Sequence, residues 1–356
     1  LLRDSWFTRR FAPEASGNGV PEVISAVTRT GGVIRPRITL MTTIASGVTI
    51  GTGGSIGREG PIVQIGAAAG SAIGQWMRLN ERSVKVLVAS GAAAGISATF
   101  GAPLAGVMFA SEVILSNFAV NSLTPIVIAA VIANLVAQKG IVLIEPERIA
   151  ENGDVLPIFH LARDFTFDNF AVLPLYLLLG LLSGLVAAAF IKVLYGTEDR
   201  LPRLIPKWYL RAILGGLFVG LCGLPTFWRS LYGVGYDAIE PCLAVKNAAD
   251  AATYIPLWVL MSLLLLKMAT TSVTLTSGGS GGIFAPSLFM GATLGGAMGQ
   301  VLALVLPDWG IQPGAFSVVG MAAVVAGTTQ GPISAVLVLF EITGDYNIIL
   351  PLMCAA

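Results

Sequence analysis

Two glycine-rich segments of the sequence end in a proline and share an unusual composition. The first reads GGSIGREGP (residues 53–61) and the second reads GGSGGIFAP (residues 278–286). Pro61 and Pro286 predict helix starts, because proline is well tolerated in the first helical turn. The backbone amides ahead of such a start have no partner inside the helix, and the helix dipole makes them attractive to an anion. The two segments therefore predict two anion-binding helix starts.

The residues just before the two prolines differ in charge. Ile283 and Phe284 carry no acidic group, so their amides are open to an external anion. In the first segment Glu59 can bend into the anion position and mimic the anion, and a proton would release it. Carboxylates inside a membrane usually mark ion or proton pathways, which makes Glu59 a candidate gate and proton carrier. Arg58 would raise the positive potential at the pore; the alternative is an Arg58–Glu59 ion pair that caps the helix.

Two further positions could contribute to anion binding. In PEASGNGVPEV (residues 13–23), Asn18 and Gly19 precede Pro21, which again predicts a helix start. Asn18 could donate its amide to an anion, although simple helix capping is the favoured reading of this segment taken alone. Lys267 lies in an apolar run and either adds positive potential to the pore or extends to the membrane interface.

The helix starts belong to an internal repeat. A shift of 225 positions aligns residues 48–75 with 273–300, with 13 of 28 identical. A shift of 229 then aligns five later positions. These pairs are Gly91/Gly320, Thr99/Thr328, Pro103/Pro332, Val107/Val336 and Glu112/Glu341. Transport proteins are often built from two such halves whose interrupted helices meet near the bilayer midplane. The alignment leaves open whether the halves are parallel or inverted.

The composition is that of an integral membrane protein. Hydrophobic residues make up 55% of the 356 residues, charged residues 12%, and the mean hydropathy is +0.80. Residues 119–138 and 171–191 are uncharged and reach the roughly 20 residues that cross a bilayer. About ten or more helices are expected, many of them short or broken by Gly and Pro. Each half carries glycines four residues apart, which favours close helix packing in lipid.

The chain divides at a polar segment. Residues 1–139 are expected to form the first half of the transmembrane domain and 171–356 the second half. Residues 140–170 contain six acidic against two basic residues, and we expect this loop outside the cytoplasm. The chain starts without Met and ends in LPLMCAA, which indicates a portion of a longer protein. A bacterial inner (plasma) membrane is the expected location.

Other functions find little support in the sequence. GGSIG and GGSGG match the G-x-S-x-G pattern, so an intramembrane serine hydrolase using Ser55 or Ser280 is a remote alternative. The only histidine, His160, lies in the acidic loop as an expected solvated residue. The three cysteines show no metal-binding spacing and the net charge is +1, so we expect no metal, no cofactor, no nucleic-acid partner and no enzyme activity.

Four segments in order resemble the CLC chloride channel and transporter family. They are GNGVPE (17–22), GREGP (57–61), GIFAP (282–286) and GPISAVLVLFE (331–341). The resemblance implies an all-α polytopic membrane protein with two inverted-topology halves, whose interrupted, tilted helices meet at a midplane anion site. It implies a homodimer in the lipid bilayer with one pore per subunit. It also implies chloride bound by the amides of Ile283 and Phe284, and Glu59 as the external gating glutamate.

Three departures from the family pattern bear on mechanism. Asn18 replaces the usual serine at a position tied to selectivity, which leaves fluoride or nitrate as alternatives to chloride. Val113 stands where exchangers carry an internal proton-transfer glutamate, with Glu112 one position earlier, so a passive channel and a chloride/proton antiporter both stay open. The family's last helix, with its coordinating tyrosine, has no counterpart in this chain.

Overall fold

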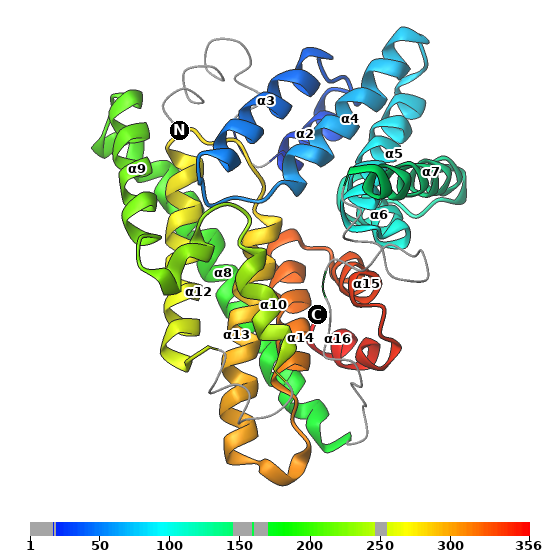
Figure 1. Cartoon of the computed structure of the whole chain (residues 1–356). Helices are drawn as coiled ribbons and strands as arrows, with labels where there is room; N and C mark the ends of the chain where they lie inside the picture. The colour runs from blue at the N-terminus through cyan, green and yellow to red at the C-terminus, as the bar shows by residue number, and fades with distance from the viewer. Residues whose placement is uncertain (1–16, 18, 145–158, 160–169, 246–254) are drawn as a thin grey trace.

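A computed structural model describes residues 17, 19–144, 159, 170–245 and 255–356 (Figure 1). In those ranges the chain is almost entirely helical, and the only β-type pairing is two isolated bridges. The prediction of an all-α polytopic fold is confirmed. His160 and nearly all of the polar 140–170 segment lie outside the described residues.

The helices of the first half follow each other through short connections. They are α2 (Val20–Arg29), α3 (Arg37–Gly51), α4 (Glu59–Trp76), α5 (Glu81–Phe100), α6 (Pro103–Phe109), the π-helical turn η2 (Ala110–Ile114) and α7 (Val120–Ile144). Helix α4 begins within the first glycine-rich segment, with Pro61 in its first turn, and α6 begins at Pro103, because proline fits a first helical turn.

The second half repeats this order after two additional helices. It comprises η4 (Phe170–Val172), α8 (Leu173–Leu204), α9 (Trp208–Cys222), η5 (Thr226–Leu231), α10 (Tyr236–Ala244), α12 (Leu257–Thr276), α13 (Phe284–Val305), η6 (Pro307–Trp309), α14 (Pro313–Thr329), α15 (Pro332–Thr343), η7 (Tyr346–Ile348) and α16 (Ile349–Ala355). Under the sequence repeat, α4 corresponds to α13, α5 to α14 and α6 to α15.

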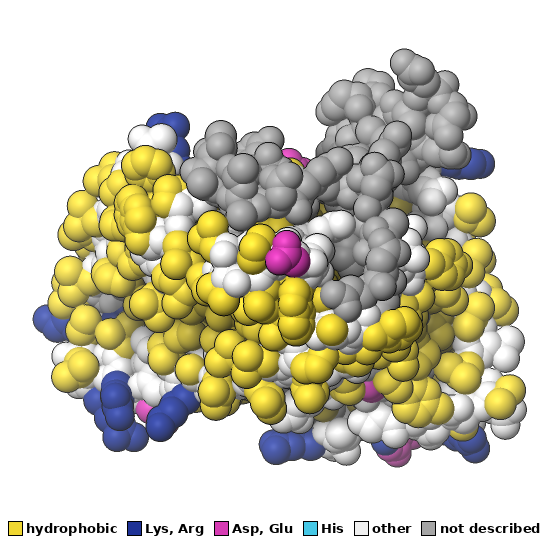
Figure 2. Space-filling model, turned by 90° about the horizontal axis from the view of Figure 1, so that it is seen from below, with side chains coloured by type: hydrophobic (Ala, Val, Ile, Leu, Met, Phe, Trp, Pro, Cys, Tyr) yellow, Lys and Arg dark blue, Asp and Glu magenta, His cyan; other side chains and the backbone are white. Residues whose placement is uncertain are grey.

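The described helices make a multi-pass membrane protein. Five of them are long and apolar enough to cross a bilayer: Glu81–Phe100, Val120–Ile141, Phe170–Leu204, Leu257–Thr276 and Phe284–Val305. Hydrophobic side chains cover much of the face seen in Figure 2, with Lys and Arg gathered at its edges. Large apolar side chains such as Leu181 and Leu185 are about two-thirds exposed, as expected for residues that face lipid tails.

The repeated glycines bring two helix pairs into backbone contact. A Cβ on Gly66 of α4 would collide with the carbonyl of Gly91 of α5, and a Cβ on Gly91 with the carbonyl of Gly66. The equivalent pair, Gly291 of α13 and Gly320 of α14, shows the same mutual contact. Only glycine permits this approach, so the packing role expected for the spaced glycines is confirmed.

Equivalent residues of the two halves also pair with each other. Gly57 N–H donates to Gly282 O at 2.8 Å and Gly282 N–H donates to Gly57 O at 2.7 Å, in an antiparallel bridge. Ser55 N–H donates to Thr274 Oγ1, and its equivalent Ser280 N–H donates to Thr49 Oγ1. Because each contact is matched by its exchanged counterpart, the two glycine-rich turns are related by a local two-fold rotation and run antiparallel.

The short helices α6 and α15 are capped in the same reciprocal way, each by a glutamate from the other half. Glu341 of α15 accepts hydrogen bonds from the amides of Leu104 and Ala105 at the start of α6. Glu112 of η2 accepts from the amides of Ile333 and Ser334 at the start of α15, and from the Ser334 hydroxyl. Each half therefore satisfies the open N-terminal amides of a helix in the other half, where the helix dipole also favours a negative charge.

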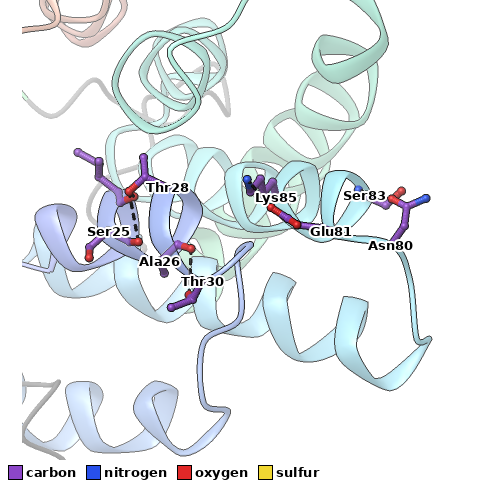
Figure 3. Close-up of polar contacts among 9 residues, drawn as sticks. Ser25, Ala26, Thr28, Thr30, Asn80, Glu81, Ser83 and Lys85 are labelled. Carbon is purple, nitrogen blue, oxygen red and sulfur yellow. Dashed lines mark hydrogen bonds and ion pairs between the residues drawn. The ribbon is translucent and has the colours of Figure 1, made fainter.

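The start of α5 is stabilised locally. Asn80 caps the helix by accepting a hydrogen bond from Ser83 N–H at 2.9 Å, and Glu81 forms an ion pair with Lys85 one turn later (Figure 3). The ion pair is largely exposed to solvent, so it contributes less than the glutamate caps exchanged between the halves.

Replacing Glu341 with Ala should lower the free energy of unfolding by about 1–3 kcal/mol, because two amides of α6 lose a charged acceptor. Replacing Glu81 with Ala, which removes only an exposed ion pair, should lower it by less than about 1 kcal/mol. Thermal unfolding in detergent, followed by tryptophan fluorescence, measures both. Equal shifts for the two variants would contradict the role given to Glu341.

Candidate functional site

A cavity of about 110 Å³ lies where three helix starts meet. Its wall includes residues from the first turns of α2, α4 and α13, together with parts of α5, α6, η2 and α14. The lining residues are Val20, Pro21, Ile24, Glu59, Gly60, Val63, Ile96, Phe109, Val113, Ile283, Phe284, Thr328 and Thr329. The cavity thus joins residues from both halves of the chain, as the sequence repeat predicts.

The helix starts around this cavity are not capped by the side chains of their own N-cap residues. None of the N-cap residues of α2, α4 and α13 (Gly19, Arg58 and Ile283) makes a side-chain cap hydrogen bond. By contrast, the starts of α6 and α15 are each filled by a glutamate from the other half. In the described part of the chain, the amides of Ile283 and Phe284 donate to no backbone carbonyl. Open amides of this kind, at the positive end of a helix dipole, attract negative charge.

Glu59 is buried at this site, with 1% of its surface exposed. An atom added on the Gly57 Cα would touch both Glu59 Oε2 and the backbone nitrogen of Ala285, so the carboxylate lies beside the first turn of α13. Oε2 has no hydrogen-bond partner that meets strict geometry among the described residues. The carboxylate therefore lies between the starts of α4 and α13, within reach of both halves.

Arg58 lies over the ring of Tyr236 and does not line the cavity. Its side chain is exposed, and its guanidinium carbon lies 5.7 Å from the ring centre of Tyr236, the first residue of α10. The Tyr236 hydroxyl donates a 2.7 Å hydrogen bond to Glu59 Oε1. The guanidinium thus contributes positive charge at the edge of the site, while a neutral hydroxyl makes the direct contact.

Lys267 is fully buried in α12 and does not extend to the membrane interface. Its ammonium donates to the carbonyls of Gly233 at 3.0 Å and Leu231 at 3.3 Å, and it lies 5.0 Å from the ring centre of Phe289. The snorkelling alternative is wrong, because the segment between η5 and α10 folds over the ammonium and supplies carbonyl acceptors. Lys267 lies close enough to Glu59 for their charges to interact, which offsets part of the cost of burying each.

The GNGVPE segment reaches the site through its glycines. Gly17 O accepts a hydrogen bond from Gly281 N–H at 3.3 Å. Gly19 has φ +83° and packs so closely on α4 that a Cβ would collide with Gly60 O, so only glycine fits there. Asn18 itself lies outside the described residues. The carboxylate of Glu22 faces the Gly19 amide, so this turn already has an acceptor of its own.

The structure separates the roles of Glu112 and Val113. The π-helical turn η2 continues α6 and directs Glu112 to the start of α15, where it serves as a cap. Val113 lines the cavity instead. Val113, at the exchangers' proton-transfer position, therefore faces the site. The carboxylate of Glu112, one position earlier, does not reach it.

Several residues of the site were not found by sequence reasoning. Tyr236, 177 positions from Glu59 along the chain, donates a side-chain hydrogen bond to the carboxylate, and nothing in its local sequence indicates that contact. Phe109 and Thr329 line the cavity without having carried any motif. Thr328 also lines it, and its match to Thr99 in the repeat was a usable signal.

The serines of the glycine-rich turns are held in structural contacts. Ser55 is fully buried, and its hydroxyl accepts a 3.1 Å hydrogen bond from Thr270. Ser280 takes part in the exchanged contact with Thr49. Ser55 thus has a threonine for a neighbour where a hydrolase needs a base. Among the described residues, no cluster of three His, Cys, Asp or Glu side chains is placed to hold a metal ion.

Comparison with known proteins places this site in a family context. The family model described as voltage gated chloride channel matches residues 1–356. The H(+)/Cl(-) exchange transporter ClcA of Cronobacter sakazakii is 32% identical over 357 residues, covering 98% of this chain and 71% of that protein. A slow cyanobacterial Cl⁻/H⁺ antiporter has a similar structure, with a TM-score of 0.81 and 25% identity over 99% of this chain and 79% of its own. A CLC-type fluoride/proton antiporter shares the fold, with a TM-score of 0.79, 24% identity and coverage of 99% and 82%.

Replacing Gly57 with Ala tests the position of the Glu59 carboxylate. The new methyl would collide with Glu59 Oε2 and crowd Ala285, so the free energy of unfolding should fall by about 1–3 kcal/mol. In a Glu59→Ala background the same change should be less destabilising, because one of the colliding groups is gone. Gly47→Ala in α3 is the control, since its Cβ meets open space and should not destabilise. Strict additivity of the Gly57 and Glu59 changes would show that the carboxylate lies elsewhere.

Proposed function

The chain belongs to the voltage gated chloride channel family, and we propose that it transports chloride across the membrane through a pore gated by Glu59. The observation that carries this proposal is the buried Glu59 carboxylate in the cavity where the starts of α2, α4 and α13 converge. A charged side chain held there competes directly with a transported anion for the same amides.

Gating follows from the charge of Glu59. While ionised, the carboxylate is attracted by the dipoles of α4 and α13 and by Lys267, and it closes the site. Protonation removes that attraction, so the side chain can leave and an anion can take its place. The amides of Ile283 and Phe284 and the positive charges of Lys267 and Arg58 then hold the anion. As one proton enters for each release of the gate, proton movement and anion movement can be linked at one residue.

We propose that this link makes the protein a chloride/proton antiporter. The ClcA relative and the cyanobacterial neighbour, whose names state chloride/proton exchange, support this reading. Passive chloride conduction is the second candidate. It is favoured by Val113, which presents an apolar side chain to the cavity at the exchangers' inner proton position, while Glu112 is engaged in capping α15.

The choice of anion and the assembly are parts of the same proposal. Chloride is the proposed ion, and fluoride is the alternative suggested by Asn18 and by the fluoride/proton antiporter that shares the fold.

The two halves are proposed to have inverted topology, in line with the exchanged contacts of Gly57 with Gly282. A homodimer is proposed from the family, and apolar side chains exposed on α6, α15 and α16 (Leu104, Ile333 and Met353) suit contact with lipid or a second copy.

The purified protein in lipid vesicles should release trapped chloride when a potassium ionophore is added. The ionophore dissipates the membrane potential that chloride efflux would otherwise build up. An ion-selective electrode measures the release, and vesicles loaded with fluoride or nitrate give the selectivity. Release of fluoride alone would replace chloride as the substrate. No flux of any of the three anions would contradict the proposed function.

The reversal potential in combined chloride and pH gradients decides between exchange and conduction. For an antiporter the potential should move with the pH gradient, and Glu59→Gln should abolish that movement because an amide side chain does not take up or release a proton near neutral pH. A value that follows chloride alone indicates a channel. Proton transport that persists unchanged in Glu59→Gln would remove Glu59 from the proton path.

A further inference from the structure

We propose that Tyr236 is a positioning residue that holds the Glu59 carboxylate in the cavity, and that its hydroxyl thereby sets the proton concentration needed to open the pore. The inference rests on the proposed gating by Glu59 and adds the residue that controls it. Tyr236 opens α10, an element that belongs to neither of the two repeated helix starts.

The contact between the two side chains is selective for the charged gate. The Tyr236 hydroxyl donates to Glu59 Oε1 at 2.7 Å, while Oε2 has no partner of good geometry in the described part of the chain. A hydrogen bond to an ionised acceptor is roughly twice as strong as one to a neutral acceptor. The hydroxyl therefore stabilises the ionised, closed gate more than the protonated gate, and it opposes proton uptake.

Tyr236 is held in place by the turn that precedes it. Gly235 has φ +86°, and a Cβ there would lie 3.0 Å from Lys267 Nζ and 2.8 Å from Phe289, so only glycine fits between them. Lys267 in turn binds the carbonyls of Leu231 and Gly233. One buried ammonium thus fixes the turn and, through it, the start of α10.

The ring of Tyr236 is fixed from two further sides. Phe159 meets it edge to face at 5.1 Å between ring centres, and the guanidinium carbon of Arg58 lies 5.7 Å from its centre. A ring held on these sides can move little, so the hydroxyl is already placed for the carboxylate. Such pre-organisation increases the net contribution of a hydrogen bond, because little side-chain entropy is lost when it forms.

Three titratable or charged side chains of the described chain face Glu59. Arg58 comes from its own helix start, Tyr236 from α10 and Lys267 from α12. The cavity residues from α2, α5, α6, η2, α13 and α14 are apolar or carry threonine hydroxyls, so they do not titrate. Removing the Tyr236 hydroxyl leaves both cations in the protein; it removes the hydrogen bond to the gate and the contact of the hydroxyl with Arg58.

The test is the pH dependence of chloride release by Tyr236→Phe in vesicles. The pH of half-maximal release should rise by about one unit, so the gate should open at a roughly tenfold lower proton concentration, since the charged gate has lost a hydrogen bond. Tyr232→Phe is the matched control. Tyr232 is also half-buried and donates a 2.6 Å hydrogen bond to Gly220 O, away from Glu59, so its loss should leave the pH profile unchanged.

A Glu59→Ala background separates gating from structure. Without a carboxylate, Tyr236→Phe should cause no further change in the rate or its pH dependence. An unshifted profile for Tyr236→Phe, or an effect that persists in Glu59→Ala, overturns the role of Tyr236 while leaving gating by Glu59 intact. If Glu59→Ala keeps the pH dependence of the native protein, gating by Glu59 fails and the role of Tyr236 fails with it. Equal elution of all variants in size-exclusion chromatography establishes that they fold.

Discussion

Backbone amides at helix starts have no partner inside their helix, and a membrane interior offers no water to satisfy them. The described fold meets this constraint in two ways. At α6 and α15 a glutamate from the other half accepts hydrogen bonds from the amides of the helix start, so these amides are satisfied within the protein. At α2, α4 and α13 the starts converge on a cavity whose polar occupant is the Glu59 side chain. A carboxylate serves as a cap at the first pair of helix starts, and in the proposed function a carboxylate is the removable occupant of the second site.

The exchanged contacts explain why the site lies between the halves. Gly57 and Gly282 donate to each other, and each glycine-rich turn binds a threonine of the opposite half. This pairing brings the starts of α4 and α13 together with opposite chain directions. Equivalent segments therefore present their amides to one cavity, although only the first half supplies a carboxylate. Under the proposed function, this asymmetry between Glu59 and Phe284 gives two similar helix starts different roles, one as a gate and the other as a binding surface.

Charge balance explains the presence of Lys267 and Tyr236 around Glu59. Glu59 and Lys267 are each costly to bury alone, and their attraction offsets part of that cost. Lys267 also holds the turn before α10, which carries Tyr236 to the carboxylate. The same ammonium thus supplies positive potential and positions a hydrogen-bond donor. Protonation of Glu59 would weaken both the ionic and the hydrogen-bonding contact in one step.

The sequence by itself determined the helix starts, the repeat and the candidate gate. Glycine, proline and apolar spacing act within a few residues, so Pro61, Pro286 and the position of Glu59 could be interpreted locally. Only the tertiary structure decided which side chains meet. Tyr236 reaches Glu59 across 177 positions, Lys267 is covered by carbonyls of a distant turn, and Glu112 turns to α15 while Val113 faces the cavity. These contacts depend on how the helices pack and on which direction a side chain takes at the end of a helix, and neither is encoded in local spacing.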